Sequence, residues 1–304
     1  MERLDLDADV LEAARSLARS QNRTLAQVVS DMARRGGAAW PDDVMVVNNV
    51  SEIPSFPPDP ARYPLFAQAA FATITLQPGD LLYIPRRWWF WEISLGRNLA
   101  LGFWHAADRL TASVPGDRER LTQIDSIRDP GGFQEYFDRK QPVALQTDEV
   151  RRWPAFERWT DAYLREAGGG RQFFVGVSPD PDLHATRGSH RTRVEAMNME
   201  QFLERGEGSP EYHYLAQNDT IPRLRRGDWS LPEFWKACFQ DEAFRVPFWF
   251  CFGKEEGITA PLHFDYYENL LAQLAGIKKI LLFSPAETPY LYRKEQQLLT
   301  PGAP

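Results

Sequence analysis

Two groups of short strand-like runs, separated by a long polar and mixed stretch, constrain the fold of this chain more than any other feature. The first group comprises FATITLQ, DLLYIP, WFWEISL and NLALGFW, and the second comprises VPFWFCFG, HFD, NLLAQLAG and KKILLFSP. β-Branched and aromatic residues are typical of strands, and Gly, Pro, Asp and Arg separate the runs of the first group. We therefore predict two antiparallel units of four strands each.

Neither unit is expected to be stable alone. Four antiparallel strands cannot cover both faces of a core and leave two edges open to aggregation, whereas eight strands can close into a jelly roll. Each group therefore supplies what the other lacks. We predict that residues 70–104 and 246–284 pack into one barrel rather than into separate domains.

The segments outside these groups have different characters. Residues 38–70 are rich in proline and predict an extended connection. Residues 110–245 are polar and mixed, with one helix expected at WPAFERWTDAYLREAGGG and another around LPEFWKACF.

The N-terminal residues 1–37 predict a strand, a helix and a second helix. Leu4 and Leu6 alternate with polar residues as in a short strand, and apolar residues at helical spacing follow. Thr24 is a candidate N-cap for the second helix, which Gly36 and Gly37 would close.

This segment, LDLDADVLEAARSLARSQNRTLAQVVSDMARRG, resembles the ribbon-helix-helix module of bacterial antitoxins. The resemblance implies that two chains pair their strands and that Arg3 and Asp5 face DNA. Asp5 is a poor residue for that position, and basic and acidic residues are balanced here. The alternative is a small helical dimerisation or packing element. We expect a homodimer, with DNA contact only through residues 1–37.

Composition limits the class of protein. The 304 residues are 43% hydrophobic, enough to bury a large core, and the net charge of −7 lacks the basic footprint of a general nucleic-acid binder. Cys238 and Cys251 are the only cysteines, which fits a reducing compartment. No signal peptide is evident, and no apolar run approaches the roughly 20 residues that span a bilayer. We expect a cytoplasmic protein without membrane contact.

His263 and Asp265 are the first candidates for chemistry. Side chains alternate along a strand, so both should lie on one face. An imidazole and a carboxylate so placed suit non-haem Fe(II), whose two-His-one-carboxylate triad leaves positions open for a co-substrate and O2. Taken alone, such a pair is more often a hydrogen-bonded core histidine beside a polar residue.

The surrounding motifs resemble bacterial JmjC-type cupins. GITAPLHFDYYENLLAQLAGIKKILLFSPAETPYLYR is similar to the first part of that family's barrel, and YPLFAQAAFATITLQPGDLLYIPRRWWFWEISLGRNLALGFW to the last part. The resemblance implies a β-rich α+β fold, a double-stranded β-helix (jelly roll) with helical decoration. It also implies that the halves stand in reversed order, with domains at 1–37, 38–110 and 111–304. A circular permutation, a piece of a tandem cupin protein and complementation between chains all remain open.

The same resemblance implies an Fe(II)- and 2-oxoglutarate-dependent oxygenase that hydroxylates a protein or small-molecule substrate. His263 and Asp265 would bind the metal, and Lys278 would pair with the distal carboxylate of 2-oxoglutarate. Tyr214 and Asn269 match positions that line the co-substrate pocket, and Thr259 is displaced by one from the family's hydroxyl position. The alternatives are a solvated lysine and ordinary buried hydrogen-bonding residues.

The third metal ligand is missing from its expected place. Relatives carry a histidine directly after the Trp-Trp pair of this motif, where this chain has Phe90. His105 is a poor substitute, and His184, His190 and His213 are expected to be surface or hydrogen-bonding residues. The site is therefore expected to be impaired. The alternatives are a non-catalytic cupin fused to a ribbon-helix-helix dimerisation or DNA-binding module, and a rearranged gene product.

Overall fold

The computed structural model describes residues 49–105, 121–182, 192–239, 244–254 and 257–294. The chain divides into two units, and nearly all described residues belong to the larger one, Ser51–Asp108 with Val114–Tyr292. The strand-helix-helix module expected at residues 1–37 lies outside the described residues. No helix in the described ranges is long and apolar enough to cross a membrane.

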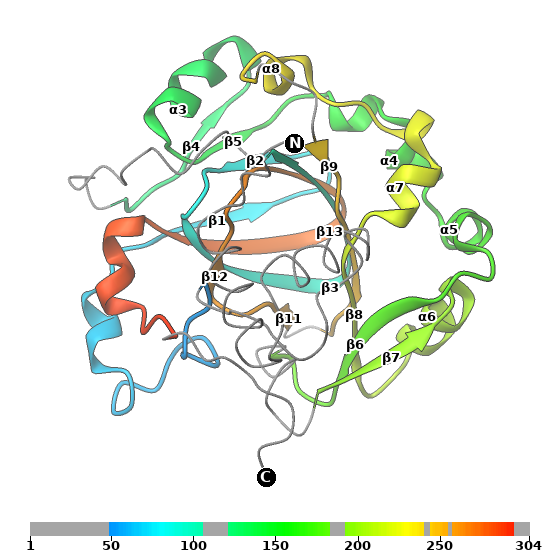
Figure 1. Cartoon of the computed structure of the whole chain (residues 1–304), viewed down its shortest axis with the longest axis horizontal. Helices are drawn as coiled ribbons and strands as arrows, with labels where there is room; N and C mark the ends of the chain where they lie inside the picture. The colour runs from blue at the N-terminus through cyan, green and yellow to red at the C-terminus, as the bar shows by residue number, and fades with distance from the viewer. Residues whose placement is uncertain (1–48, 106–120, 183–191, 240–243, 255–256, 295–304) are drawn as a thin grey trace, which may run out of the picture. The chain divides into compact units, whose positions relative to one another are not determined.

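One β-sheet dominates the larger unit (Figure 1). Its main path runs β4-β5-β2-β13-β3-β10-β8-β6-β7, with four further strands attached to β3 or β13. The thirteen strands of the described residues are β1 (Ala72–Leu76), β2 (Leu81–Ile84), β3 (Trp89–His105), β4 (Asp125–Ile127), β5 (Val143–Leu145), β6 (Phe173–Ser178), β7 (Arg193–Met197), β8 (Tyr212–Asn218), β9 (Phe244–Arg245), β10 (Phe248–Phe252), β11 (Ile258–Thr259), β12 (His263–Phe264) and β13 (Glu268–Phe283).

Strands β3 and β13 join the two groups that the sequence predicted. They pair antiparallel along almost their whole length, from Glu268 opposite His105 to Phe283 opposite Trp89. Strand β10 pairs with β3, and β1 and β2 both pair with β13. The prediction that residues 70–104 and 246–284 pack together is therefore confirmed.

The predicted strand count is wrong at two places, because four expected strands are two long ones. WFWEISL and NLALGFW are both parts of β3, while NLLAQLAG and KKILLFSP are both parts of β13. Gly96 and Gly276 have φ values of 63° and 74°, which allow a bend without ending the strand. A Cβ at Gly276 would collide with the Arg97 carbonyl oxygen of β3, so this position of β13 requires glycine.

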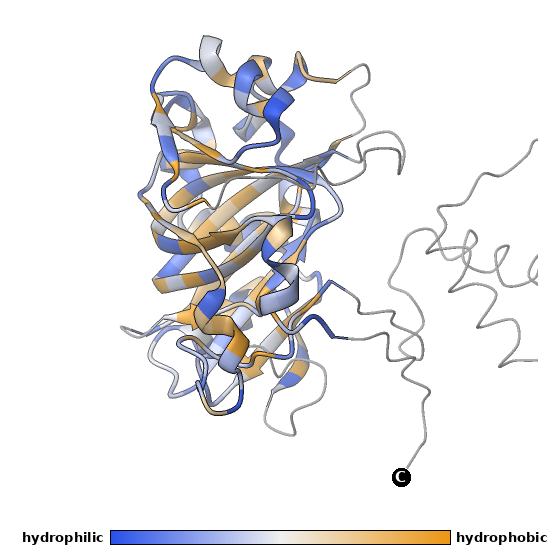
Figure 2. Cartoon of the chain, turned by 90° about the vertical axis from the view of Figure 1, so that its left-hand side faces the viewer, coloured by the Kyte–Doolittle hydropathy of each residue, from blue (hydrophilic) through white to orange (hydrophobic). Residues whose placement is uncertain are grey.

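The long strands separate three hydrophobic clusters. Even-numbered residues of β3, such as Phe90, Ala100 and Trp104, face an interior cluster that also contains residues of β1, β2, β10 and β13. Trp89 and Trp91 face a second cluster, shared with Phe283. Figure 2 shows apolar residues concentrated in the strands and hydrophilic ones on the surrounding segments.

Helices cover the third cluster, which lies on the odd-numbered face of the C-terminal half of β3. The helix expected at residues 153–170 is two helices, because Trp159 leaves helical geometry and Thr160 caps the second. Residues 110–245, expected to be polar and mixed with two helices, also supply β4 to β9. The helices are α3 (Phe133–Arg139), α4 (Pro154–Arg158), α5 (Asp161–Gly168), α6 (Met199–Gly206), α7 (Thr220–Leu224) and α8 (Glu233–Lys236).

Candidate functional site

His263 and Phe90 stand directly opposite each other on β12 and β3. Their ring centroids are 4.3 Å apart with an interplanar angle of 53°, so the phenyl ring packs against the imidazole. His263 Nδ1 lies 2.6 Å from the Pro261 carbonyl oxygen, which can only accept, so Nδ1 carries the proton. Nε2 is therefore the nitrogen with a lone pair for a metal.

Asp265 follows His263 by two residues and is half-buried like it. Burial raises the pKa of Asp265 above its usual range, His263 lowers it, and the negative charge of Glu92 raises it further. The side chain of Asn269 forms a hydrogen bond to the carboxylate, which favours the ionised form. The structure thus brings His263, Asp265 and Asn269 together.

Lys278 lies on β13 and only 1% of its side chain is exposed. This excludes the solvated lysine that the sequence left open. Its Nζ lies 3.4 Å from Glu92 Oε1 on β3, and 9% of the Glu92 side chain is exposed. Glu92 was not among the residues predicted from the sequence. The signal that could have found it is its spacing, because Glu92 follows Phe90 by two residues and shares its face.

Tyr214 and Cys251 complete the polar surroundings, directly opposite each other on β8 and β10. Burial raises the pKa of Tyr214 well above its usual value, and the charges of Glu92, Cys251 and Asp265 raise it further. Burial also raises the pKa of Cys251 to about 11, although Lys278 acts in the opposite direction. Both groups are therefore neutral at physiological pH.

Asn269 keeps one unsatisfied polar atom. Its Oδ1 is buried and has no hydrogen-bond partner among the described residues, and the same is true of Nε1 of Trp104, which stands opposite Asn269 across β3 and β13. Buried polar groups normally have partners. These two atoms are consistent with a polar ligand near the site.

Thr259 is not part of this group. It pairs with Ile93 on β3, one residue out of phase with Glu92, and directly opposite residues share a face. Its side chain forms a hydrogen bond to Asp182, and its backbone N–H donates to the Pro181 carbonyl oxygen. The Thr259 hydroxyl thus forms its hydrogen bond beside β11 and does not lie on the side of the sheet that carries Lys278.

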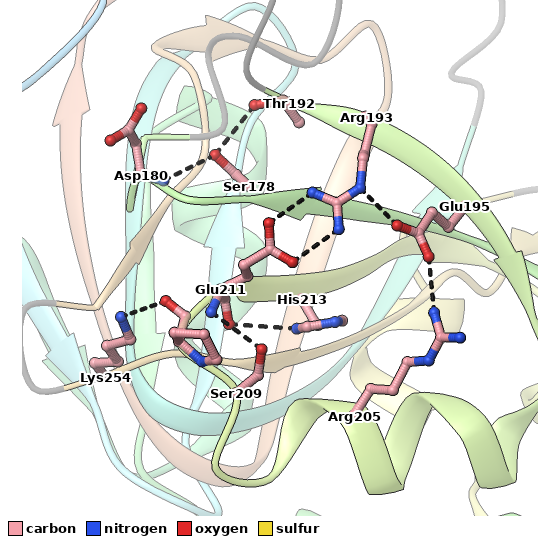
Figure 3. A network of polar contacts seen from close by, with 11 residues as sticks. Ser178, Asp180, Thr192, Arg193, Glu195, Arg205, Ser209, Glu211, His213 and Lys254 are labelled. Atoms are coloured by element: carbon pink, nitrogen blue, oxygen red, sulfur yellow. Dashed lines mark hydrogen bonds and ion pairs between the residues drawn. The ribbon is translucent and has the colours of Figure 1, made fainter.

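The remaining histidines are elsewhere. His105 is buried at the far end of β3, stacked on Phe239 with ring centroids 3.9 Å apart. His213 lies on β8 beside a polar network of β6, β7 and α6, and its Nδ1 lies 3.3 Å from the Glu211 carbonyl oxygen (Figure 3). His184 and His190 lie outside the described residues.

The residues present do not fit a complete iron triad. In the described part of the chain no three His, Cys, Asp or Glu side chains are grouped so that they could hold a metal ion. His263 and Asp265 are two candidate ligands, and Phe90 offers carbon where a third donor would be needed. Two surface hollows in the described part of the chain, one lined around Trp153 and one around Arg128, share no residue with this group.

Known proteins similar to this chain include the putative JmjC domain-containing protein L887 of Acanthamoeba polyphaga mimivirus, 24% identical over 77% of the chain and 37% of that protein. The lysine-specific demethylase 8 of Danio rerio is 32% identical over 54% of the chain and 40% of that protein. The human tRNA wybutosine-synthesizing protein 5 is 27% identical over 60% of the chain and 61% of that protein. The chain thus spans less than two thirds of the length of these relatives.

The β-rich sheet is consistent with a cupin double-stranded β-helix, and these relatives include JmjC domain proteins. A family model described as a cupin-like domain matches residues 13–109 and 131–304, which is most of the sequence. The chain therefore belongs to the cupin-like domain family.

Proposed function

We propose that this chain is a JmjC-type cupin with an impaired Fe(II) and 2-oxoglutarate site, derived from a hydroxylase of protein or small-molecule substrates. Family membership and the JmjC relatives support the oxygenase origin. The impairment is inferred from a single observation, the packing of the Phe90 ring against His263. An apolar ring stands there in place of the nitrogen donor that a histidine would provide.

Two candidate ligands define a metal site poorly. His263 Nε2 and the Asp265 carboxylate can each donate one bond to Fe(II), while losing the third ligand removes a bond and the geometric definition of the site. We therefore expect weak Fe(II) binding and slight turnover.

The test is to restore the missing donor. We expect Phe90→His to tighten anaerobic Fe(II) binding by about tenfold or more, because the new imidazole stands opposite His263. His263→Ala should abolish binding in either background. Anaerobic Fe(II) titration measures the affinity, and succinate formation from 2-oxoglutarate measures turnover.

Phe264→His is the matched control. Phe264 is also a buried phenylalanine, but it pairs with Trp89 and lies in the cluster on the opposite face of β3. It should leave Fe(II) affinity unchanged. Strong turnover by the unmodified protein would show that the third ligand was misplaced, and a folded Phe90→His protein with unchanged affinity would also contradict the proposal.

A second candidate function is a non-catalytic cupin that serves as a scaffold, joined to a ribbon-helix-helix-like module for dimerisation or DNA binding. The internal pairing of Lys278 with Glu92 favours it, because both charges are satisfied without a ligand. We also propose that the chain forms a homodimer in the cytoplasm and that any DNA contact is made only through residues 1–37. Deleting residues 1–37 should lower the oligomer size in light scattering.

We also propose that the family's two barrel halves stand in reversed order along this chain. The proposal rests on the order of the two motifs along the sequence. The pairing of β12 and β13 with β3, with His263 opposite Phe90, shows that the two segments form one sheet in either order. A permuted variant that places residues 49–105 after residue 294 should fold to the same secondary-structure content by circular dichroism if the two halves form one closed unit.

A further inference from the structure

Glu92 and Lys278 form the most deeply buried ion pair next to the candidate site among the described residues. Glu92 stands opposite Ile280 and Lys278 stands opposite Ser94, so the two charged residues are diagonal neighbours across β3 and β13. Both follow the spacing of residues that face the interior cluster, Phe90 on β3 and Ile280 on β13.

A buried ammonium group needs an anion. An unpaired charge removed from water is strongly disfavoured, and at 1% exposure Lys278 cannot reach solvent. The resemblance to JmjC-type cupins implied that a carboxylate of 2-oxoglutarate would be that anion. In this chain the carboxylate at 3.4 Å belongs to the protein.

The surrounding charges disfavour a second anion. The charge of Glu92 contributes to the raised pKa of Asp265, so the two carboxylates already repel each other. Nearby Tyr214 and Cys251 are neutral and add no positive charge. A dicarboxylate brought to Lys278 would therefore meet two repelling carboxylates, Glu92 and Asp265, although the positive charges of His263 and Arg245 partly offset that of Asp265.

We propose that Glu92 is a built-in carboxylate that occupies the place at Lys278 which a dicarboxylate ligand would take, and so prevents 2-oxoglutarate from binding. The role of Glu92 rests on the proposed function, because that function assigns Lys278 to the binding of 2-oxoglutarate, as in JmjC-type cupins. It goes beyond the missing metal ligand, because restoring a histidine at Phe90 leaves the Glu92 carboxylate in place.

The experiment measures dicarboxylate binding without metal, so that it does not depend on the iron site. Isothermal titration of the metal-free chain with 2-oxoglutarate should show no binding in the millimolar range for the unmodified protein. Glu92→Gln keeps the shape and removes the charge, and it should increase affinity at least about tenfold. The double variant Glu92→Gln/Lys278→Met should lose that gain.

Glu287→Gln is the matched control, because Glu287 is also a buried carboxylate but lies outside the sheet, in the 3-10 helix Pro285–Tyr290, and accepts a hydrogen bond from the Ala70 N–H. It should not create binding. Micromolar binding of 2-oxoglutarate by the unmodified protein would overturn the proposal, and this holds even if Glu92→Gln fails to fold. A folded Glu92→Gln protein that still does not bind would also overturn it.

The outcome is separable from that of the metal test. If Phe90→His fails to tighten Fe(II) binding while Glu92→Gln gains 2-oxoglutarate, the metal part of the proposed function fails and the role of Glu92 stands. If Phe90→His tightens Fe(II) binding and the unmodified chain binds 2-oxoglutarate, the role of Glu92 fails. If the proposals for Phe90 and for Glu92 both hold, only the double variant Phe90→His/Glu92→Gln should show raised succinate formation.

Discussion

Two groups of ion pairs in this protein differ in geometry and in surroundings. On the surface, Arg193 on β7 donates from Nη1 and Nη2 to the two carboxylate oxygens of Glu211, at 2.6 and 2.7 Å, and from Nε to Glu195 at 2.6 Å (Figure 3). In the interior, Lys278 and Glu92 meet at one distance of 3.4 Å. The surface group has the better hydrogen bonds, and the interior pair has almost no solvent.

The difference shows that short distances do not measure importance. The Arg193 side chain is 48% exposed, so water can replace Glu211 and Glu195 if they are removed. Lys278 has no such replacement, because removing Glu92 leaves a charge in an apolar interior. The looser pair should therefore be the more costly one to break.

Breaking the interior pair should have the largest effect. We expect Lys278→Met to lower the free energy of unfolding by about 3 kcal/mol, because Glu92 is then buried without its cation and beside Asp265. The double variant Glu92→Leu/Lys278→Met should recover most of that loss. Urea unfolding of the single and double variants measures both, and equal losses would show that the pair does not act as a unit.

The Cys251 thiol, next to Lys278 and Glu92, should make the free energy of unfolding depend on pH in the alkaline range. The pKa of Cys251 is about 11 in the folded protein, compared with about 8.5 in an unfolded chain. The folded state holds the proton more tightly, so stability present below pH about 8.5 is lost as pH rises toward about 11. At pH about 9.5 we expect a loss of roughly 1 kcal/mol from this group.

Cys251→Ser separates this group from others that titrate in the same range. The serine hydroxyl keeps a similar shape and does not ionise there, so the pH dependence of urea unfolding between neutral and alkaline pH should be shallower in the variant. Identical slopes would show that burial of Cys251 does not hold its proton.

Breaking the surface group should have the smallest effect. Arg193→Ala should lower the free energy of unfolding by less than about 1 kcal/mol, and high salt should reduce the difference further. Thermal unfolding at low and high salt measures this. A loss as large as that of Lys278→Met would remove the contrast between the two groups.

Much of the fold followed from local sequence pattern. β-Branched and aromatic content and turn residues located most strand segments of β1, β2, β3, β10 and β13, and the inability of either group to cover a core predicted their pairing. The pattern failed near Gly96 and Gly276, where it divided each long strand into two. Positive φ values at Gly96 and Gly276 let both strands bend and continue. The continuity becomes evident only from the pairing of each strand with its neighbour on both sides of the bend.

The sequence by itself predicted that His263 and Asp265 share a face, because alternation along a strand is a local property. The resemblance to JmjC-type cupins placed Phe90 where relatives carry a histidine. The tertiary structure decided the partner of Lys278. Glu92 lies 186 residues away along the chain, and the pair forms only because β3 and β13 align with Ser94 opposite Lys278. Such a register depends on the bulges and bends of both strands together, which no single segment encodes.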